Sequence, residues 1–152
     1  MYFTSLVQGT LVHLFNLPKF NHLKHIKASD KYTVLLLTGI ANPGHLINHV
    51  GKFCNTIHQL TYPDHYTYKN KDVEKLLSTY HSIKDEKKII VTTEKDSMRL
   101  HDVGNASELM NLPIFFVPLK IHFTNKDKVE FDKQIIDYDR KNKRNSNLFT
   151  VK

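Results

Sequence analysis

Residues 33–43 read Thr-Val-Leu-Leu-Leu-Thr-Gly-Ile-Ala-Asn-Pro, an apolar run that stops abruptly at a turn. A short apolar run bounded by turn residues is typical of a β-strand. Gly39 permits a close turn of the backbone, and Asn42 and Pro43 are suited to cap and open a helix. The stretch therefore predicts a strand over 33–38 followed by a helix over about 43–53.

The same alternation of a short apolar strand and a helix-length segment repeats along the chain. Successive βα units build a parallel sheet that is covered by helices. The expected fold class is therefore α/β, in three layers: a mainly parallel, Rossmann-like sheet with helices on both faces. Further strands are expected at 56–61, 88–92 and 114–120, and further helices at 70–81, 94–102 and 105–111.

The two ends of the chain follow a different pattern. Apolar residues on both sides of Gly9-Thr10 predict a pair of strands around that turn. Residues 120–123 and 129–131 flank the turn-like Asn125-Lys126-Asp127, which predicts a terminal hairpin or edge pair. A last helix is expected from Asp132, and the end of the chain is expected to be disordered. The expected divisions are a lead-in over 1–32, an α/β lobe over 33–140 and a basic tail over 141–152.

Charge and cysteine content limit the classes of function. The 22 Lys and Arg residues outnumber the 15 Asp and Glu residues, and the net charge of +7 favours anionic partners. A free-standing basic domain that binds nucleic acid is an alternative that this charge permits, although no RNA- or DNA-binding motif supports it. The single cysteine, Cys54, excludes an intrachain disulfide and a thiolate metal cage. No apolar run approaches the roughly 20 residues that span a bilayer.

Chemistry is expected where the predicted strands end, because ligands of open parallel sheets collect at the carboxyl ends of the strands. Asp64-His65 follows the second strand and places a carboxylate beside an imidazole, which could orient or accept a proton near neutral pH. The same dipeptide could instead form an ordinary loop turn in which Asp64 binds local amides. Asn42, after the first strand, could serve only as a cap or could leave the following amides facing a phosphate.

The third strand end carries Thr93-Glu94-Lys95-Asp96. Thr93 and Asp96 have the spacing of a capping box, and Glu94 suits the first turn of a helix. Lys95 does not, because a cation at the amino terminus of a helix opposes the helix dipole. An anionic ligand or a nearby carboxylate would relieve that conflict. The four residues are therefore candidates for a position close to a substrate or a phosphate group.

The sequence has no nucleotide-phosphate cradle of a known pattern. Its five glycines, at 9, 39, 44, 51 and 104, cannot form Gly-x-x-x-x-Gly-Lys-[Ser/Thr] or Gly-x-Gly-x-x-Gly. Histidine pairs such as His22 with His25 have no matched acidic ligand, so no metal site is expected.

The three strand ends together resemble the tetraacyldisaccharide 4'-kinases of lipid A biosynthesis. Residues 37–43, LTGIANP, resemble the family's TGIANP run; Asp64-His65 resembles its DH loop; residues 91–96, VTTEKD, resemble its TTEKD run. Phe3-Thr4-Ser5 also resembles the stretch that leads into this half in relatives from Bacteroidetes-type bacteria. The resemblance covers most of residues 2–140.

This resemblance implies a lipid A kinase in which a P-loop domain precedes the present region. The γ-phosphoryl group of ATP would pass to the 4'-hydroxyl of a tetraacyldisaccharide 1-phosphate at the cytoplasmic face of the inner membrane. The chain would be the carboxy-terminal lobe, joined to the P-loop domain through residues 1–32. His65 would assist deprotonation of the acceptor hydroxyl, together with an aspartate of the P-loop domain. Asp64 would orient His65 or shape the loop. The family frequently has a second histidine where this chain has Tyr66.

The resemblance also implies cofactors and partners. ATP and Mg²⁺ would bind the full-length enzyme, and neither is expected to bind tightly to this chain. Without a P-loop lysine and the Mg²⁺ ligands, the chain alone is expected to be inactive, because phosphoryl transfer depends on those groups. The expected partners are the amino-terminal P-loop lobe, the lipid A precursor disaccharide and the membrane surface, without nucleic acid. The chain itself is expected to be soluble.

Overall fold

The computed structural model describes residues 4–123 and 125–146. These residues belong to two compact units. Residues 8–119 form one unit, and the second comprises the chain before Gln8 and after Leu119. None of the helices in the described ranges is long and apolar enough to cross a membrane.

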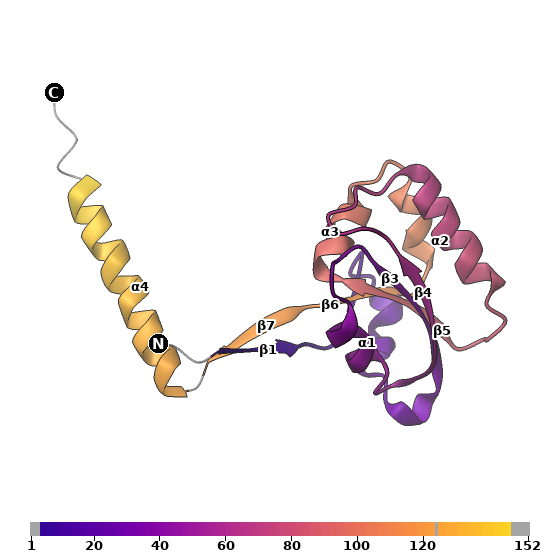
Figure 1. Ribbon diagram of the computed structural model, residues 1–152, viewed down its shortest axis with the longest axis horizontal. Coiled ribbons are helices and arrows are strands. Elements are labelled where there is room, and N and C mark those ends of the chain that lie inside the picture. The colour runs from indigo at the N-terminus through magenta and orange to yellow at the C-terminus, as the bar shows by residue number, and fades with distance from the viewer. Residues whose placement is uncertain (1–3, 124, 147–152) are drawn as a thin grey trace. The chain divides into compact units, whose positions relative to one another are not determined.

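A five-stranded sheet forms the centre of the larger unit, in the order β2-β6-β5-β3-β4 (Figure 1). The most apolar segment of the chain, β3 (Tyr32–Thr38), lies between two parallel neighbours, β4 (Cys54–Thr61) and β5 (Lys88–Thr93). β6 (Ile114–Val117) continues the parallel order, and the short β2 (Val12–His13) pairs antiparallel with β6. The prediction of an α/β fold with a mainly parallel sheet is confirmed.

Both faces of the sheet are covered, because successive side chains of a strand point to opposite faces. Leu35 and Leu37 pack in a core with residues of α2 (Asn70–Ser82), α3 (Glu94–His101) and the 3-10 helix η3 (Ala106–Asn111). Val34 and Leu36 pack in a second core with residues of α1 (Gly44–Val50) and the 3-10 helix η1 (Pro18–His25). A further 3-10 turn, η2 (Ala28–Asp30), precedes β3. The predicted three layers are therefore present.

The strand expected over 114–120 is divided in two. β6 ends at Val117, and β7 begins at Leu119 and runs to Phe123. Pro118 separates them, since proline has no N–H group to donate to a strand ladder. The Pro118 carbonyl instead accepts a hydrogen bond from the Gly9 amide at 2.9 Å.

The prediction of a terminal hairpin or edge pair over residues 120–131 is wrong. α4 (Asn125–Ser146) is one helix that includes residues 129–131, and β7 pairs with β1 (Thr4–Gln8) in a separate two-stranded sheet. The 22 residues of α4 contain no Gly or Pro, so no strong helix breaker stands where the turn was expected. The helix also enters the segment that was expected to be disordered and continues to Ser146; residues 147–152 lie outside the described part of the chain.

The strands expected on either side of Gly9-Thr10 exist as β1 and β2, but they pair with β7 and β6 and not with each other. The segment after Gln8 belongs to the larger unit and to its core. Leu11 and Leu23 are buried there. His13 is 1% exposed, and its Nε2 lies 3.0 Å from the Leu112 carbonyl oxygen. Burial lowers the pKa of His13, which suits a neutral, structural imidazole.

Candidate active site

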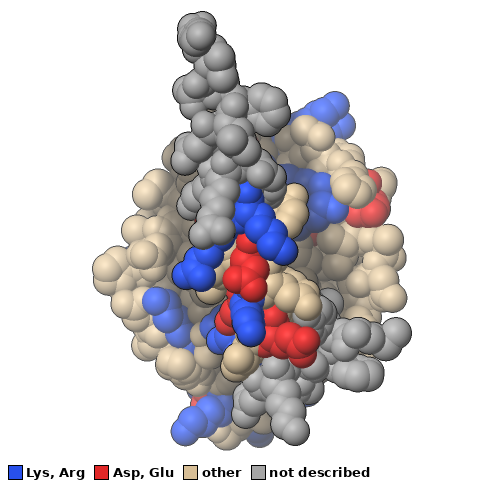
Figure 2. Space-filling model, turned by 90° about the vertical axis from the view of Figure 1, so that its left-hand side faces the viewer, with Lys and Arg blue, Asp and Glu red and all other residues tan. Residues whose placement is uncertain are grey.

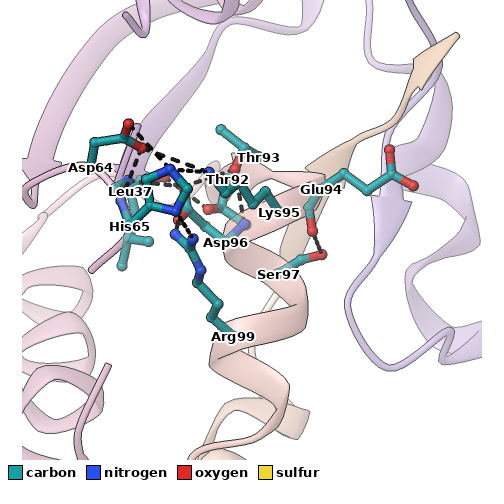
Figure 3. A network of polar contacts seen from close by, with 11 residues as sticks. Leu37, Asp64, His65, Thr92, Thr93, Glu94, Lys95, Asp96, Ser97 and Arg99 are labelled. Carbon is teal, nitrogen blue, oxygen red and sulfur yellow. Dashed lines mark hydrogen bonds and ion pairs between the residues drawn. The ribbon is translucent and has the colours of Figure 1, made fainter. Parts of the chain in front are cut away.

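Three strand ends meet in one network of polar contacts at the carboxyl edge of the parallel strands. Gly39 follows β3, the loop with Asp64 and His65 follows β4, and α3 begins directly after β5. Figure 3 shows the Asp64-His65 loop facing the first turns of α3. The predicted convergence follows from the parallel order, which brings the carboxyl ends of β4, β3 and β5 to the same edge of the sheet.

Asp96 holds the network together from inside. Its side chain is fully buried, and Oδ2 accepts hydrogen bonds from the Gly39 amide at 2.9 Å and from the Thr93 hydroxyl at 2.8 Å. The Asp96 amide in turn donates to the Thr93 hydroxyl oxygen at 3.0 Å, the helix cap predicted for Thr93. The Asp96 carboxylate thus binds the Gly39 amide at the end of β3 as well as Thr93. These two hydrogen bonds join the start of α3 to the end of β3.

Gly39 lies where a side chain would have no space. A Cβ atom at this position would stand 2.9 Å from the Tyr68 hydroxyl and 3.0 Å from Asp96 Oδ1. The close approach of the backbone to these two buried groups therefore explains the glycine. Burial and the negative charge of Asp96 raise the pKa of Tyr68, so its hydroxyl stays neutral beside the carboxylate.

Replacing Gly39 with alanine is expected to destabilise the fold by roughly 1–3 kcal/mol, as overpacking of a filled interior does. The methyl group would push against Tyr68 and weaken the hydrogen bond from the Gly39 amide to Asp96. Urea denaturation followed by circular dichroism measures the change. Gly104→Ala is the matched control, because its Cβ would meet nothing closer than 3.5 Å. Equal stability of the two variants would contradict the close packing described for Gly39.

The loop after β4 turns sharply at Asp64 and His65. The Tyr66 amide donates to the Pro63 carbonyl at 3.2 Å, and the His65 amide donates to Asp64 Oδ1 at 2.9 Å. His65 has a φ of 59°, a left-handed conformation that costs a non-glycine residue of order 1 kcal/mol. The local bond of Asp64 is the ordinary turn contact anticipated for it. Glycine would adopt this positive φ at a lower energetic cost. The turn alone therefore does not explain why a histidine occupies the position.

Both ring nitrogens of His65 lie near charged groups. Nε2 is 3.3 Å from the Lys95 ammonium and 3.6 Å from Asp64 Oδ2, and Nδ1 is 3.4 Å from Arg99 Nη2. The imidazole is nevertheless 73% exposed to solvent. It is therefore held by its neighbours and still open to a ligand approaching the edge of the sheet.

Lys95 has the carboxylate neighbour that its position at the start of α3 called for. Its Nζ lies 3.8 Å from Asp64 Oδ1. This ion pair partly offsets the unfavourable interaction of the cation with the helix dipole. Both groups are well exposed, so the pair adds little to stability and positions the two side chains around His65.

Two predicted site residues lie outside this cluster. Asn42 is exposed, and its Oδ1 accepts a hydrogen bond from the Gly44 amide at 3.0 Å. The prediction that Asn42 caps the helix is wrong by one position, because Pro43 precedes the first residue of α1, Gly44. Figure 3 shows the Glu94 side chain turned away from Asp64 and His65. Glu94 Oε2 instead accepts from the Leu119 amide at 3.2 Å. Asn42 therefore makes a local turn contact, and Glu94 makes a contact with the backbone between β6 and β7.

Arg99 belongs to the cluster and was not a candidate from sequence. Its Nη1 lies 3.3 Å from Asp96 Oδ1 and its Nη2 reaches His65, so it connects the buried carboxylate to the exposed imidazole. Residues three and four apart share a face of a helix, and Arg99 follows Asp96 by three residues and Lys95 by four. This spacing is the signal that could have identified Arg99.

Three tyrosines in and beside the Asp64-His65 loop pack against one another. The rings of Tyr62, Tyr66 and Tyr68 lie with centroids 4.7 to 5.4 Å apart. The Tyr66 hydroxyl donates to the buried Asp72 at 3.2 Å, and Asp72 also accepts from the Lys69 amide at 2.8 Å. Burial and the nearby Asp72 charge raise the pKa of Tyr62 to about 12. Tyr66 thus anchors the loop to the start of α2.

The residues that the structure describes contain no group of three His, Cys, Asp or Glu side chains that could hold a metal ion. The sequence has no glycine-rich phosphate loop. Figure 2 shows both basic and acidic side chains among the described residues of that view.

Comparison with known proteins decides the family. The family model of the tetraacyldisaccharide-1-P 4'-kinases, LpxK, matches residues 7–138. The chain belongs to this kinase family. The tetraacyldisaccharide 4'-kinases of Phocaeicola vulgatus and Bacteroides thetaiotaomicron are 36% and 31% identical to it, over 97% of the present chain in each case. The one from Flavobacterium psychrophilum is 34% identical over 82% of the chain.

The chain spans about 40% of the length of the first two of these relatives. This agrees with the interpretation of the chain as one lobe of a longer kinase. A solved structure of LpxK from Aquifex aeolicus, in complex with ATP, is 18% identical, with a TM-score of 0.43 over 83% of this chain and 33% of its own. A likeness of that size carries no argument about the site.

Proposed function

We propose that this chain is the carboxy-terminal lobe of an ATP-dependent kinase that phosphorylates the 4'-hydroxyl of a tetraacyldisaccharide 1-phosphate, a step of lipid A biosynthesis. One observation supports this most directly: a carboxylate, an imidazole and two cations converge at the edge of a parallel sheet, with His65 exposed. Family membership supplies the reaction. The place of the cluster is the one where open α/β sheets bind their ligands.

In this proposal His65 assists removal of the proton from the acceptor hydroxyl. Its exposed imidazole can contact a hydroxyl directly, and Asp64 is placed beside Nε2 to orient it. Phosphoryl transfer depends mainly on positioning and on stabilising negative charge. Lys95 and Arg99 provide positive charge next to His65, and the Thr93 and Asp96 contacts hold the start of α3 in place. Asn42 and Glu94 shape the adjoining loop ends.

ATP and Mg²⁺ fit a different part of the enzyme, because the residues described here offer neither a phosphate loop nor a metal cluster. We assign them to a P-loop lobe, corresponding to the remaining length of the relatives. Residues 1–32 would lead from that lobe into this one. The acylated acceptor would bring the assembled enzyme to the surface of the inner membrane.

The 152-residue chain alone is expected to show no phosphotransfer to the lipid acceptor with Mg-ATP, since the groups that hold the nucleotide are missing. A radiolabelled ATP assay on purified protein checks this. Turnover above a no-protein blank would contradict it.

A chimera tests the proposed function itself. Residues 1–152 would replace the matching segment of the Phocaeicola vulgatus kinase, which is 36% identical to them. The chimera is expected to phosphorylate the tetraacyldisaccharide, and the same relative truncated before the junction is expected to be inert. A chimera that folds, as judged by circular dichroism, and gives no product would contradict the assignment.

A further inference from the structure

We propose that Arg99 is a positioning residue that fixes the tautomer of His65, with Nδ1 as the acceptor and the proton on Nε2. The inference rests on the proposed function for its catalytic meaning, but not for its structural content. Two cations face the two ring nitrogens of His65, and a neutral imidazole cannot accept a hydrogen bond from both.

A neutral imidazole has one N–H group and one lone pair, whereas lysine and arginine side chains only donate. Arg99 Nη2 faces Nδ1 at 3.4 Å, and Lys95 Nζ faces Nε2 at 3.3 Å. Only one of the two cations can therefore donate to the ring in a given tautomer. The other must face an N–H group without bonding to it.

The surroundings favour Arg99 as the donor. Its side chain is 23% exposed and is held by the fully buried Asp96, whereas Lys95 is 46% exposed and is paired at 3.8 Å with a partly exposed Asp64. A planar guanidinium anchored at one nitrogen loses little further freedom when another nitrogen donates. Lys95 can rotate away at lower cost.

The second ring nitrogen gives an independent reason. Asp64 Oδ2 lies 3.6 Å from Nε2, so a proton on Nε2 is near the negative charge of a carboxylate. A proton on Nδ1 would point toward the Arg99 guanidinium, with no acceptor among the contacts of that nitrogen in the described part of the chain. Asp64 and Arg99 therefore favour the same tautomer, with the proton on Nε2.

This tautomer defines how His65 assists the reaction. Nε2–H is a donor that can orient an anionic group or a carboxylate base, and the lone pair on Nδ1 is occupied by Arg99. The role of His65 is then to position the group that accepts the proton. Asp96 influences His65 indirectly, because Asp96 holds Arg99 and Arg99 contacts His65.

Long-range ¹H–¹⁵N correlation spectra of the histidine side chains test the proposal in the 152-residue chain, without nucleotide or lipid. At a pH where the imidazole is neutral, Nδ1 of His65 should resonate as an unprotonated nitrogen and Nε2 as a protonated one. A His65→Asn spectrum assigns the signals. The protonated state on Nδ1 in the unaltered chain would overturn the proposal.

Two variants separate the cations. Arg99→Met keeps an unbranched apolar stem without a donor and should move the proton toward Nδ1 in part or all of the molecules; Lys95→Met should leave it on Nε2. The reverse pattern, or no change in Arg99→Met with an otherwise native amide spectrum, would overturn the assignment.

If Arg99→Met unfolds, the spectra of the unaltered chain and of Lys95→Met still show which ring nitrogen carries the proton and whether Lys95 controls it. Because no turnover is measured, failure here leaves the kinase proposal standing, and an inert chimera leaves this one standing.

Discussion

Replacing His65 with asparagine in the chimeric kinase is expected to lower kcat by about 10²- to 10⁴-fold, the usual contribution of a group that assists proton transfer. Asparagine is chosen because it tolerates a positive φ, and His65 has a φ of 59°. The turn at Asp64 and the contacts of Asp96 should therefore persist while the imidazole is lost. Steady-state phosphotransfer rates at saturating Mg-ATP and lipid measure the effect.

His81→Asn is the matched control, since His81 is an exposed histidine in the last turn of α2. Its kcat should equal that of the parent chimera. If the His65 variant also retains full kcat, the Asp64-His65 loop has only a structural role and the proposed site is wrong.

Replacing Asp96 with alanine is expected to lower the free energy of unfolding of the 152-residue chain by roughly 3 kcal/mol. The substitution leaves the buried amide of Gly39 without its acceptor and removes the ion-pair partner of Arg99. It also removes the bond that ties the Thr93 cap to the end of β3. Denaturant unfolding at neutral pH measures the loss.

Asp102→Ala is the control, because Asp102 follows the last residue of α3 and its side chain is 82% exposed. Little change in stability is expected there. Asp96→Asn should fall between the two variants, because the amide oxygen can still accept from Gly39 while the charge is lost. Equal unfolding curves for Asp96→Ala and Asp102→Ala would show that the buried network contributes nothing to stability.

The strands and helices of the larger unit could be predicted because their signals are local. The run from Val34 to Leu37 is continuously apolar, and the turn at Gly39 ends it within two residues. The end of the chain could not be predicted correctly, because Val129 and Phe131 alternate with Glu130 as in a strand, while the segment has no Gly or Pro that would interrupt a helix. The partner of β7 is β1, more than 100 residues away in sequence, and no local pattern specifies such a pairing.

The candidate site divides in the same way. Asp64, His65 and Lys95 could be proposed from sequence, since each follows directly after a strand whose carboxyl end lies at one edge of a parallel sheet. Asn42 and Glu94 satisfied the same rule, but their side chains bind the Gly44 and Leu119 amides instead. Position after a strand therefore does not determine where a side chain points.

The sequence by itself determined the α/β class, the family motifs and the residue types gathered at the strand ends, because periodicity, capping residues and turn glycines act over a few neighbouring positions. Only the tertiary structure decided that Asp96 lies under the end of β3, that Arg99 reaches His65, and that Gly39 has no room for a side chain. Those features join residues 29 to 57 positions apart. They depend on how β3, β5 and the loop after β4 pack together, which no local pattern encodes.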